Sequence, residues 1–121
     1  MANPFVHVEL ATTDLDKAKS FYQALFDWKL DEMVMDGGMS YTMIDVGEGT
    51  GGGMMKHPMP GEPSRWLAYV NVDNVAEATA TARSLGARIV RDVTEVPNAG
   101  SFSIIIDPTG AVLGLWQPRQ K

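Results

Sequence analysis

The sequence predicts an α+β domain made of two βαβββ modules, and three observations lead to this fold class. A strand-like run, an amphipathic helix pattern and further strand-like runs follow one another in the first half of the chain. The same order starts again after a proline-rich connector. The two halves align over most of their length at an offset of 60 residues, at which Asp14 meets Asn74. We therefore expect one domain over 1–121, with module one at about 4–57, the connector at 58–63 and module two at about 64–118.

Module one begins with an alternating run at 5–10, in which Phe5, His7 and Glu9 share one face of the predicted strand. Thr13 and Asp14 then indicate a helix start, with Asp16 in a capping-box position. The helix has an apolar stripe that should pack on a sheet, formed by Leu15, Ala18, Phe21, Tyr22, Leu25 and Phe26. Three more strands are expected, at 28–35, 40–46 and 52–56, with a turn at 36–38 between the first two.

Module two repeats this order. A strand is expected at 66–72 and a helix at 74–85, with Asn74 as its N-cap and Gly86 as its C-terminal stop. The offset of 60 also aligns 43–45 with 103–105 and the loop at 47–50 with 107–110. Each module should therefore form a sheet with a helix on one face, and the other face needs cover.

Composition narrows the class of partner. The formal net charge is -5 over 121 residues, so neither nucleic acid nor an anionic membrane is an expected partner. The chain has no cysteine, which excludes thiolate metal sites and cysteine nucleophiles. Neither a leader peptide nor an apolar run of transmembrane length is evident, so we expect a cytoplasmic protein. A small neutral or cationic ligand fits this composition best.

Several segments together resemble the vicinal oxygen chelate superfamily, the group of glyoxalases, bleomycin resistance proteins and ring-cleaving dioxygenases. They are Val8–Leu10 with Thr13–Leu15, the run Phe21–Trp28, and the late turn Asp107–Gly110. Asp27 departs from the pattern, because many relatives have glycine there. The resemblance implies curved mixed sheets around a concave cavity and a two-fold homodimer, in which a site can combine both chains.

The resemblance also implies where a divalent metal would bind, since metal-dependent relatives use four ligands, commonly two His and two Glu. His7 matches the first position, seven residues before Asp14. The other positions align with Leu67, Gly114 and Met54, none of which is a suitable ligand for a divalent metal. We therefore expect no cofactor, with a divalent metal as the alternative.

His7 and Glu9 are the candidate catalytic residues, although a hydrogen-bonded cavity histidine and a solvated carboxylate are the plainer interpretations. The glycine-rich run 47–53 lacks the lysine and the following helix of a phosphate loop, so it predicts a sharp turn, a bulge or a close approach of ligand or backbone. Strand parity predicts a mostly apolar cavity lining, for which core packing or a dimer interface is the competing explanation: Phe5, Met54, Lys56, Leu67, Tyr69 and Trp116.

Three functions follow from these residues. The first is metal-independent binding of a small apolar or aromatic molecule, as in bleomycin resistance relatives. The second is a metal-dependent lyase, isomerase or dioxygenase. The third is a metal-free enzyme that uses His7 or Glu9 as general base.

Overall fold

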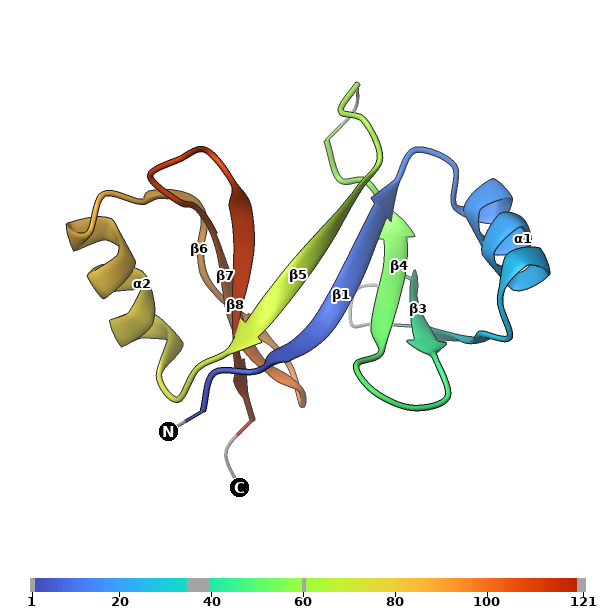
Figure 1. The fold of residues 1–121 in the computed structure, drawn as a ribbon, viewed down its shortest axis with the longest axis horizontal. Coiled ribbons are helices and arrows are strands. Elements are labelled where there is room, and N and C mark those ends of the chain that lie inside the picture. Colours follow the sequence, from blue (N-terminus) through green and yellow to red (C-terminus); the bar gives the residue numbers. More distant parts are fainter. Residues whose placement is uncertain (1, 35–39, 60, 120–121) are drawn as a thin grey trace. The chain divides into compact units, whose positions relative to one another are not determined.

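The computed structural model of the chain describes residues 2–34, 40–59 and 61–119, which form two compact units. The N-terminal unit comprises His7–Leu67, and the C-terminal unit comprises Met1–Val6 with Ala68–Lys121. Each unit contains strands and one helix, which confirms the α+β class (Figure 1). The expected turn at 36–38 lies outside the described residues. The single domain and its module bounds stay predictions.

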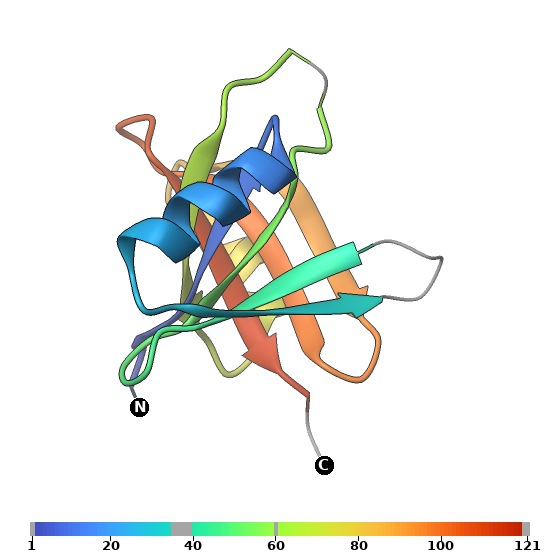
Figure 2. The same ribbon diagram turned by 90° about the vertical axis from the view of Figure 1, so that its right-hand side faces the viewer.

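The N-terminal unit follows the predicted β-α-β-β-β order. Its strands lie in the order β2-β3-β4-β1, with β1 and β4 parallel and the other neighbours antiparallel. In Figure 2, α1 crosses in front of the strands of its own unit. The elements are β1 (Phe5–Thr12), which belongs to this unit from His7 onward, α1 (Leu15–Leu25), β2 (Lys29–Val34), β3 (Ser40–Asp45) and β4 (Gly52–Lys56).

The C-terminal unit repeats this arrangement. Its strands lie in the order β5-β8-β7-β6, with β5 and β8 parallel and the other neighbours antiparallel. The repeat predicted from the sequence is therefore present in the topology of the two units. The elements are β5 (Arg65–Asn71), which belongs to this unit from Ala68 onward, α2 (Val75–Ser84), β6 (Arg88–Val96), β7 (Gly100–Ile106) and β8 (Val112–Pro118).

The helix ends show which capping predictions hold. Asn74 accepts a hydrogen bond from the Glu77 backbone N–H at 3.0 Å, as expected for the N-cap of α2. Gly86 has a φ of 102° just after α2 ends, which confirms it as the stop. In α1 the cap is Asp14, which accepts from the Lys17 N–H at 3.1 Å, and not a box starting at Thr13. Neither described helix is long and apolar enough to cross a membrane.

A small apolar core lies between helix and sheet in each unit. In the N-terminal unit Leu10, Ile44 and Met54 are buried, and Leu15, Ala18 and Tyr22 of α1 pack against them. The rest of the predicted stripe is wrong as a packing surface, since three of its side chains are exposed: Phe21, Leu25 and Phe26. The equivalent core of the C-terminal unit is Val75, Ile105 and Leu115.

The strand register corrects the alignment of the two modules. Glu9 pairs with Gly53, and Tyr69, its counterpart 60 positions later, pairs with Gly114. Gly53 and Gly114 are 61 positions apart, so the counterpart of Gly114 is Gly53 and not Met54. The pairing of β6 with β7 shifts in register between Ile89 and Thr94, whereas the pairing of β2 with β3 is continuous. The spacing between equivalent residues of the two modules is therefore not constant along the chain.

The corrected alignment pairs Thr42 of the N-terminal unit with Ser103 of the C-terminal unit, and both are buried. The Ser103 hydroxyl lies 2.8 Å from the Thr79 hydroxyl, which itself donates to the Val75 carbonyl at 2.5 Å. In α1 the position equivalent to Thr79 is Lys19, and the Thr42 hydroxyl has no hydrogen-bond partner among the residues that the structure describes. A buried hydroxyl without a partner costs free energy of folding.

We expect Thr42→Val to raise the free energy of unfolding by about 1 kcal/mol, because it removes an unpaired hydroxyl and keeps the side-chain shape. The matched change Ser103→Ala should lower it by about 1 kcal/mol, since it leaves Thr79 with one partner fewer. Urea unfolding of the wild type and both variants measures the two differences. Destabilisation by Thr42→Val would show that its hydroxyl is satisfied.

Candidate functional site

One face of the N-terminal sheet carries the candidate ionisable residues. Leu10 belongs to the core under α1, so His7 and Glu9, at odd positions of β1, lie on the opposite face. Glu9 pairs with Gly53 of β4, and Gly53 pairs with Met43 of β3. These side chains, with their alternate neighbours on the same strands, form a surface that we call the His7 face: His7, Glu9, Tyr41, Met43, Gly53 and Met55.

Tyr41 joins the two residues predicted as catalytic. Its hydroxyl oxygen lies 2.7 Å from Nε2 of His7, and the hydroxyl donates to Oε2 of Glu9 at 2.9 Å. The His7 and Tyr41 rings are nearly parallel, with centroids 6.2 Å apart and an angle of 23° between their planes. The structure therefore places His7 and Glu9 in one hydrogen-bonded array through a third residue, although i and i+2 side chains of a strand do not meet directly.

Sequence reasoning missed Tyr41, although a signal was present. Tyr41 and Met43 alternate on the predicted strand at 40–46, so strand parity alone makes Tyr41 a candidate for one of the two faces. The choice of face depends on the pairing of β3 with β4, which places Met43 opposite Gly53. A tyrosine combines an apolar ring with a hydroxyl that needs a partner when half-buried.

The glycine run at 51–53 makes this arrangement possible. A methyl group on Gly53 would overlap the Tyr41 ring and hydroxyl, and one on Gly52 would overlap the Val8 carbonyl. Gly51 also lies close to the backbone, since a Cβ there would be 2.9 Å from the Ile44 carbonyl oxygen. The predicted close approach is thus confirmed for the backbone and for a side chain.

Burial lowers the pKa of His7 below its ordinary value of 6.5, because the half-buried site solvates the imidazolium poorly. The lowered pKa therefore favours the neutral imidazole of His7 at neutral pH. A neutral imidazole has one N–H and one basic nitrogen, so it can donate one hydrogen bond and accept a proton.

This shift predicts a pH dependence of stability. As pH falls below 6.5, the unfolded chain takes up a proton on His7 that the folded chain resists. The contribution to the free energy of unfolding is therefore complete above pH 6.5 and is lost as pH falls toward the lowered pKa. In His7→Gln this part of the pH dependence should vanish, whereas His57→Gln should keep it. Urea unfolding between about pH 5 and 7.5 compares the three proteins; identical profiles would contradict the expectation.

Two predicted lining residues lie on the wrong face. Met54 is fully buried in the core with Leu10 and Ile44, and Lys56 shares its parity on β4. The prediction that Met54 and Lys56 share a face with His7 is therefore wrong. The error came from the offset of 60, and a shift of one residue turns every side chain of a strand to the other face. Met55, and not Met54, lies on the face of the sheet that carries His7.

The other predicted lining residues keep their expected parity. Leu67 and Tyr69 are two positions apart on β5 and share one face of the strand, and both are buried. In the C-terminal unit Tyr69 packs edge-on against Phe102 at 6.2 Å, and Trp116 pairs with Phe102 on β7. Phe5 is 62% exposed. Whether these side chains bind a ligand stays a prediction.

The residues at the metal positions of the resemblance do not fit a divalent metal. After correction of the alignment, the positions on β4 and β8 are Gly53 and Gly114, and the position on β5 is Leu67. A methyl group on Gly114 would overlap the Tyr69 ring, so this position has no room for a longer side chain. Among residues 2–34, 40–59 and 61–119, no three His, Asp, Glu or Cys side chains form a group that could hold a metal ion.

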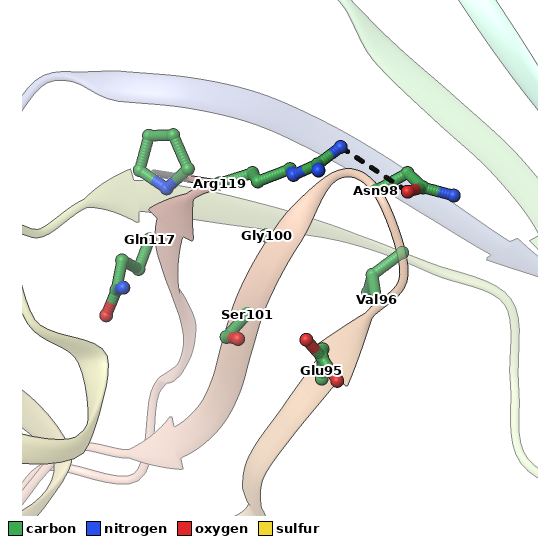
Figure 3. A pocket seen from close by; sticks show the side chains of 8 residues that line it. Glu95, Val96, Asn98, Gly100, Ser101, Gln117 and Arg119 are labelled. Carbon is green, nitrogen blue, oxygen red and sulfur yellow. Dashed lines mark hydrogen bonds between the residues drawn. The ribbon is translucent and has the colours of Figure 1, made fainter. Parts of the chain in front are cut away.

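Two hollows in the described structure lie away from the His7–Tyr41–Glu9 array. One, of about 320 Å³, is polar and lies at the end of β6, β7 and β8; Figure 3 shows Arg119 pointing toward Asn98, with Nη1 and Oδ1 3.4 Å apart. The other, of about 260 Å³, lies in the N-terminal unit and is lined largely by apolar atoms, including Trp28, Trp66 and Val8. Val8 has the opposite parity to His7, so this apolar hollow is separate from the His7 face.

Comparison with known proteins decides the family. The model of the glyoxalase/bleomycin resistance protein/dioxygenase superfamily matches residues 5–115 of this chain. The chain belongs to this superfamily. A relative in the superfamily, named "Putative glyoxylase CFP32" from Mycobacterium tuberculosis, is 32% identical over 110 residues, or 91% of this chain. The chain spans 42% of the length of that relative.

Solved structures of similar proteins support the fold. Hypothetical protein BH1468 from Bacillus halodurans superposes with a TM-score of 0.75 at 12% identity, over 100% of this chain and 98% of that protein. Methylmalonyl-CoA epimerase from Mycobacterium tuberculosis superposes with a TM-score of 0.71 at 20% identity, over 96% of this chain and 88% of the epimerase. At these identities the similarity concerns the fold alone.

Proposed function

We propose that this superfamily member binds a small apolar or aromatic molecule on the His7 face, without a metal ion. The observation that carries the proposal is the array in which Tyr41 connects His7 and Glu9, at 2.7 and 2.9 Å. Half-buried polar groups on an otherwise apolar face fix the orientation of a ligand, as in most small-molecule sites. A cofactor-free protein, a homodimer and a cytoplasmic location stay predictions.

The surroundings of the array support an apolar ligand. Met43 and Met55 share the His7 face, and methionine side chains adapt to flat ligands of varied shape. Glu9 supplies a carboxylate, which favours ligands with an N–H, an O–H or a positive charge. This chemistry agrees with the net charge of -5.

A second candidate function is a metal-free enzyme with His7 or Glu9 as general base. The continuous hydrogen bonds from His7 through Tyr41 to Glu9 favour it, because they connect two proton acceptors. Relatives of similar fold include methylmalonyl-CoA epimerases, whose name denotes a change of configuration at carbon, and such a reaction is compatible with proton transfer. This candidate uses the same residues as the binding proposal.

A ligand screen tests the binding proposal. Aromatic and planar compounds should quench tryptophan emission or raise the melting temperature of the wild type. Glu9→Gln should then weaken a ligand with an N–H or O–H donor about tenfold, since a hydrogen bond to a charged group contributes about 1.5 kcal/mol or more. His57→Gln is the matched control. If binding survives Glu9→Gln and His7→Gln but is lost in Trp66→Ala, the apolar hollow is the site and the proposal is wrong.

The same protein tests the metal-free part of the proposal. Zinc, nickel or manganese should leave the melting temperature unchanged, and untagged protein should contain no stoichiometric divalent metal. About one metal per chain, lost in His7→Gln, would contradict this and restore a metal-dependent lyase, isomerase or dioxygenase.

A further inference from the structure

The hydrogens of the His7–Tyr41–Glu9 array can be assigned from its geometry. A tyrosine hydroxyl has a single hydrogen, and that of Tyr41 is donated to Oε2 of Glu9 at 2.9 Å. The contact of 2.7 Å between the Tyr41 oxygen and Nε2 of His7 then needs a hydrogen on Nε2. All donors therefore point in one direction, from His7 through Tyr41 to Glu9.

This direction makes Nδ1 the basic nitrogen of His7. When Nδ1 accepts a proton, Nε2 can pass its own hydrogen to the Tyr41 oxygen, and Tyr41 can pass its hydrogen to Glu9. The carboxylate becomes a carboxylic acid, and His7 ends as the neutral Nδ1–H tautomer. A lasting imidazolium is thereby avoided, which matters because burial disfavours the charged form of His7.

We propose that Tyr41 is a positioning residue that relays protons, through which His7 removes a proton from a weakly acidic O–H or C–H ligand and delivers it to Glu9. This inference rests on the proposed binding function and names its ligand class. The step is balanced: the ligand loses one proton and becomes an anion, and Glu9 gains that proton and becomes neutral. Phenols, enols and carbonyl compounds with an acidic α-hydrogen are the substrates that such a site suits.

The position of Tyr41 is set before any ligand binds. Its ring lies over the backbone of Gly53, where no other residue leaves room for it. The His7 ring, whose centroid lies 6.2 Å from that of Tyr41, contacts the hydroxyl end of Tyr41 at 2.7 Å and restrains it there. A hydroxyl fixed in this way makes both hydrogen bonds without the entropic cost of ordering a free side chain.

The first test uses 4-nitrophenol, whose phenolate form absorbs visible light. Wild type and the control Tyr22→Phe should bind it and ionise it at a pH at which the free probe is largely protonated. Tyr41→Phe should bind 4-nitrophenol, but the bound probe should show the spectrum of the neutral phenol. The acid ionisation constant of the probe bound to Tyr41→Phe should be about tenfold lower than that of the probe bound to the wild type, as expected for the loss of one charge-assisted hydrogen bond. Tyr22 is a suitable control because it belongs to α1 and not to the His7 face. Its hydroxyl lies 3.3 Å from the indole nitrogen of Trp66.

The outcomes separate this inference from the binding proposal. Equal ionisation of the bound probe in wild type and Tyr41→Phe would overturn the relay and leave binding intact. A wild type that binds neither 4-nitrophenol nor any other compound of the screen would contradict the binding proposal and this inference together.

The second test needs no ligand. The chain has two histidines, so ¹⁵N-histidine spectra of His57→Gln identify His7 directly. Wild type and Tyr22→Phe should show His7 as the neutral Nε2–H tautomer, and Tyr41→Phe should shift the tautomer equilibrium of His7 toward Nδ1–H because the Tyr41 oxygen no longer accepts the Nε2 hydrogen. An Nδ1–H tautomer in the wild type would overturn the inference. An Nε2–H tautomer that persists in Tyr41→Phe would overturn it as well.

Discussion

Gly52→Ala is expected to lower the free energy of unfolding of this protein by about 3 kcal/mol, the largest effect of an added methyl group that we predict. Gly52 pairs with Val8 across the parallel strands β1 and β4, and an added Cβ would overlap the Val8 carbonyl. A backbone group has no rotamer with which to move away. The two strands must therefore separate, which also weakens the bond from Val8 N to the Gly51 carbonyl at 3.2 Å.

Gly47→Ala is the matched control for Gly52→Ala. Gly47 has a φ of 101°, and no atom of the described residues lies within 4 Å of an added Cβ, so the change costs only backbone strain of about 1 kcal/mol. Urea unfolding of both variants measures the difference. Equal losses of stability would show that close approach of β1 and β4 is not the reason for the glycine.

Met54→Ala is expected to lower the free energy of unfolding by about 3 kcal/mol, because it opens a cavity in the N-terminal core. The Met54 side chain is fully buried, with Leu10 and Ile44 as its buried neighbours. Met55→Ala is the control, since Met55 is only half-buried and lies on the His7 face. Met55→Ala should lower the free energy of unfolding by about 1 kcal/mol.

The same pair of variants locates the ligand site. Met54→Ala should leave ligand affinity unchanged at a temperature where the variant is folded, whereas Met55→Ala should weaken an apolar ligand. Fluorescence titration of both variants measures the two affinities. The opposite result would mean that the ligand enters the helix-packed core.

Local sequence patterns predicted the individual helices and strands of the fold. Asn74 and Gly86 predicted the ends of α2, and alternation along β1 separated His7 and Glu9 from Leu10. These features depend on a few neighbouring residues, so the chain shows them without knowledge of distant contacts. The same holds for the glycine run, which predicted a close approach but not the group that approaches.

The sequence by itself determined the repeated βαβββ order, the superfamily and the face of β1 that carries His7 and Glu9. Only the tertiary structure decided which residues of β3 and β4 join that face. The counterparts of the β8 residues on β4 lie 61 and not 60 positions earlier, and because side chains alternate with a period of two, this difference of one residue exchanged Met54 for Gly53. Tyr41 reaches His7 and Glu9 only because β4 brings a glycine, and not a methionine, beneath its ring.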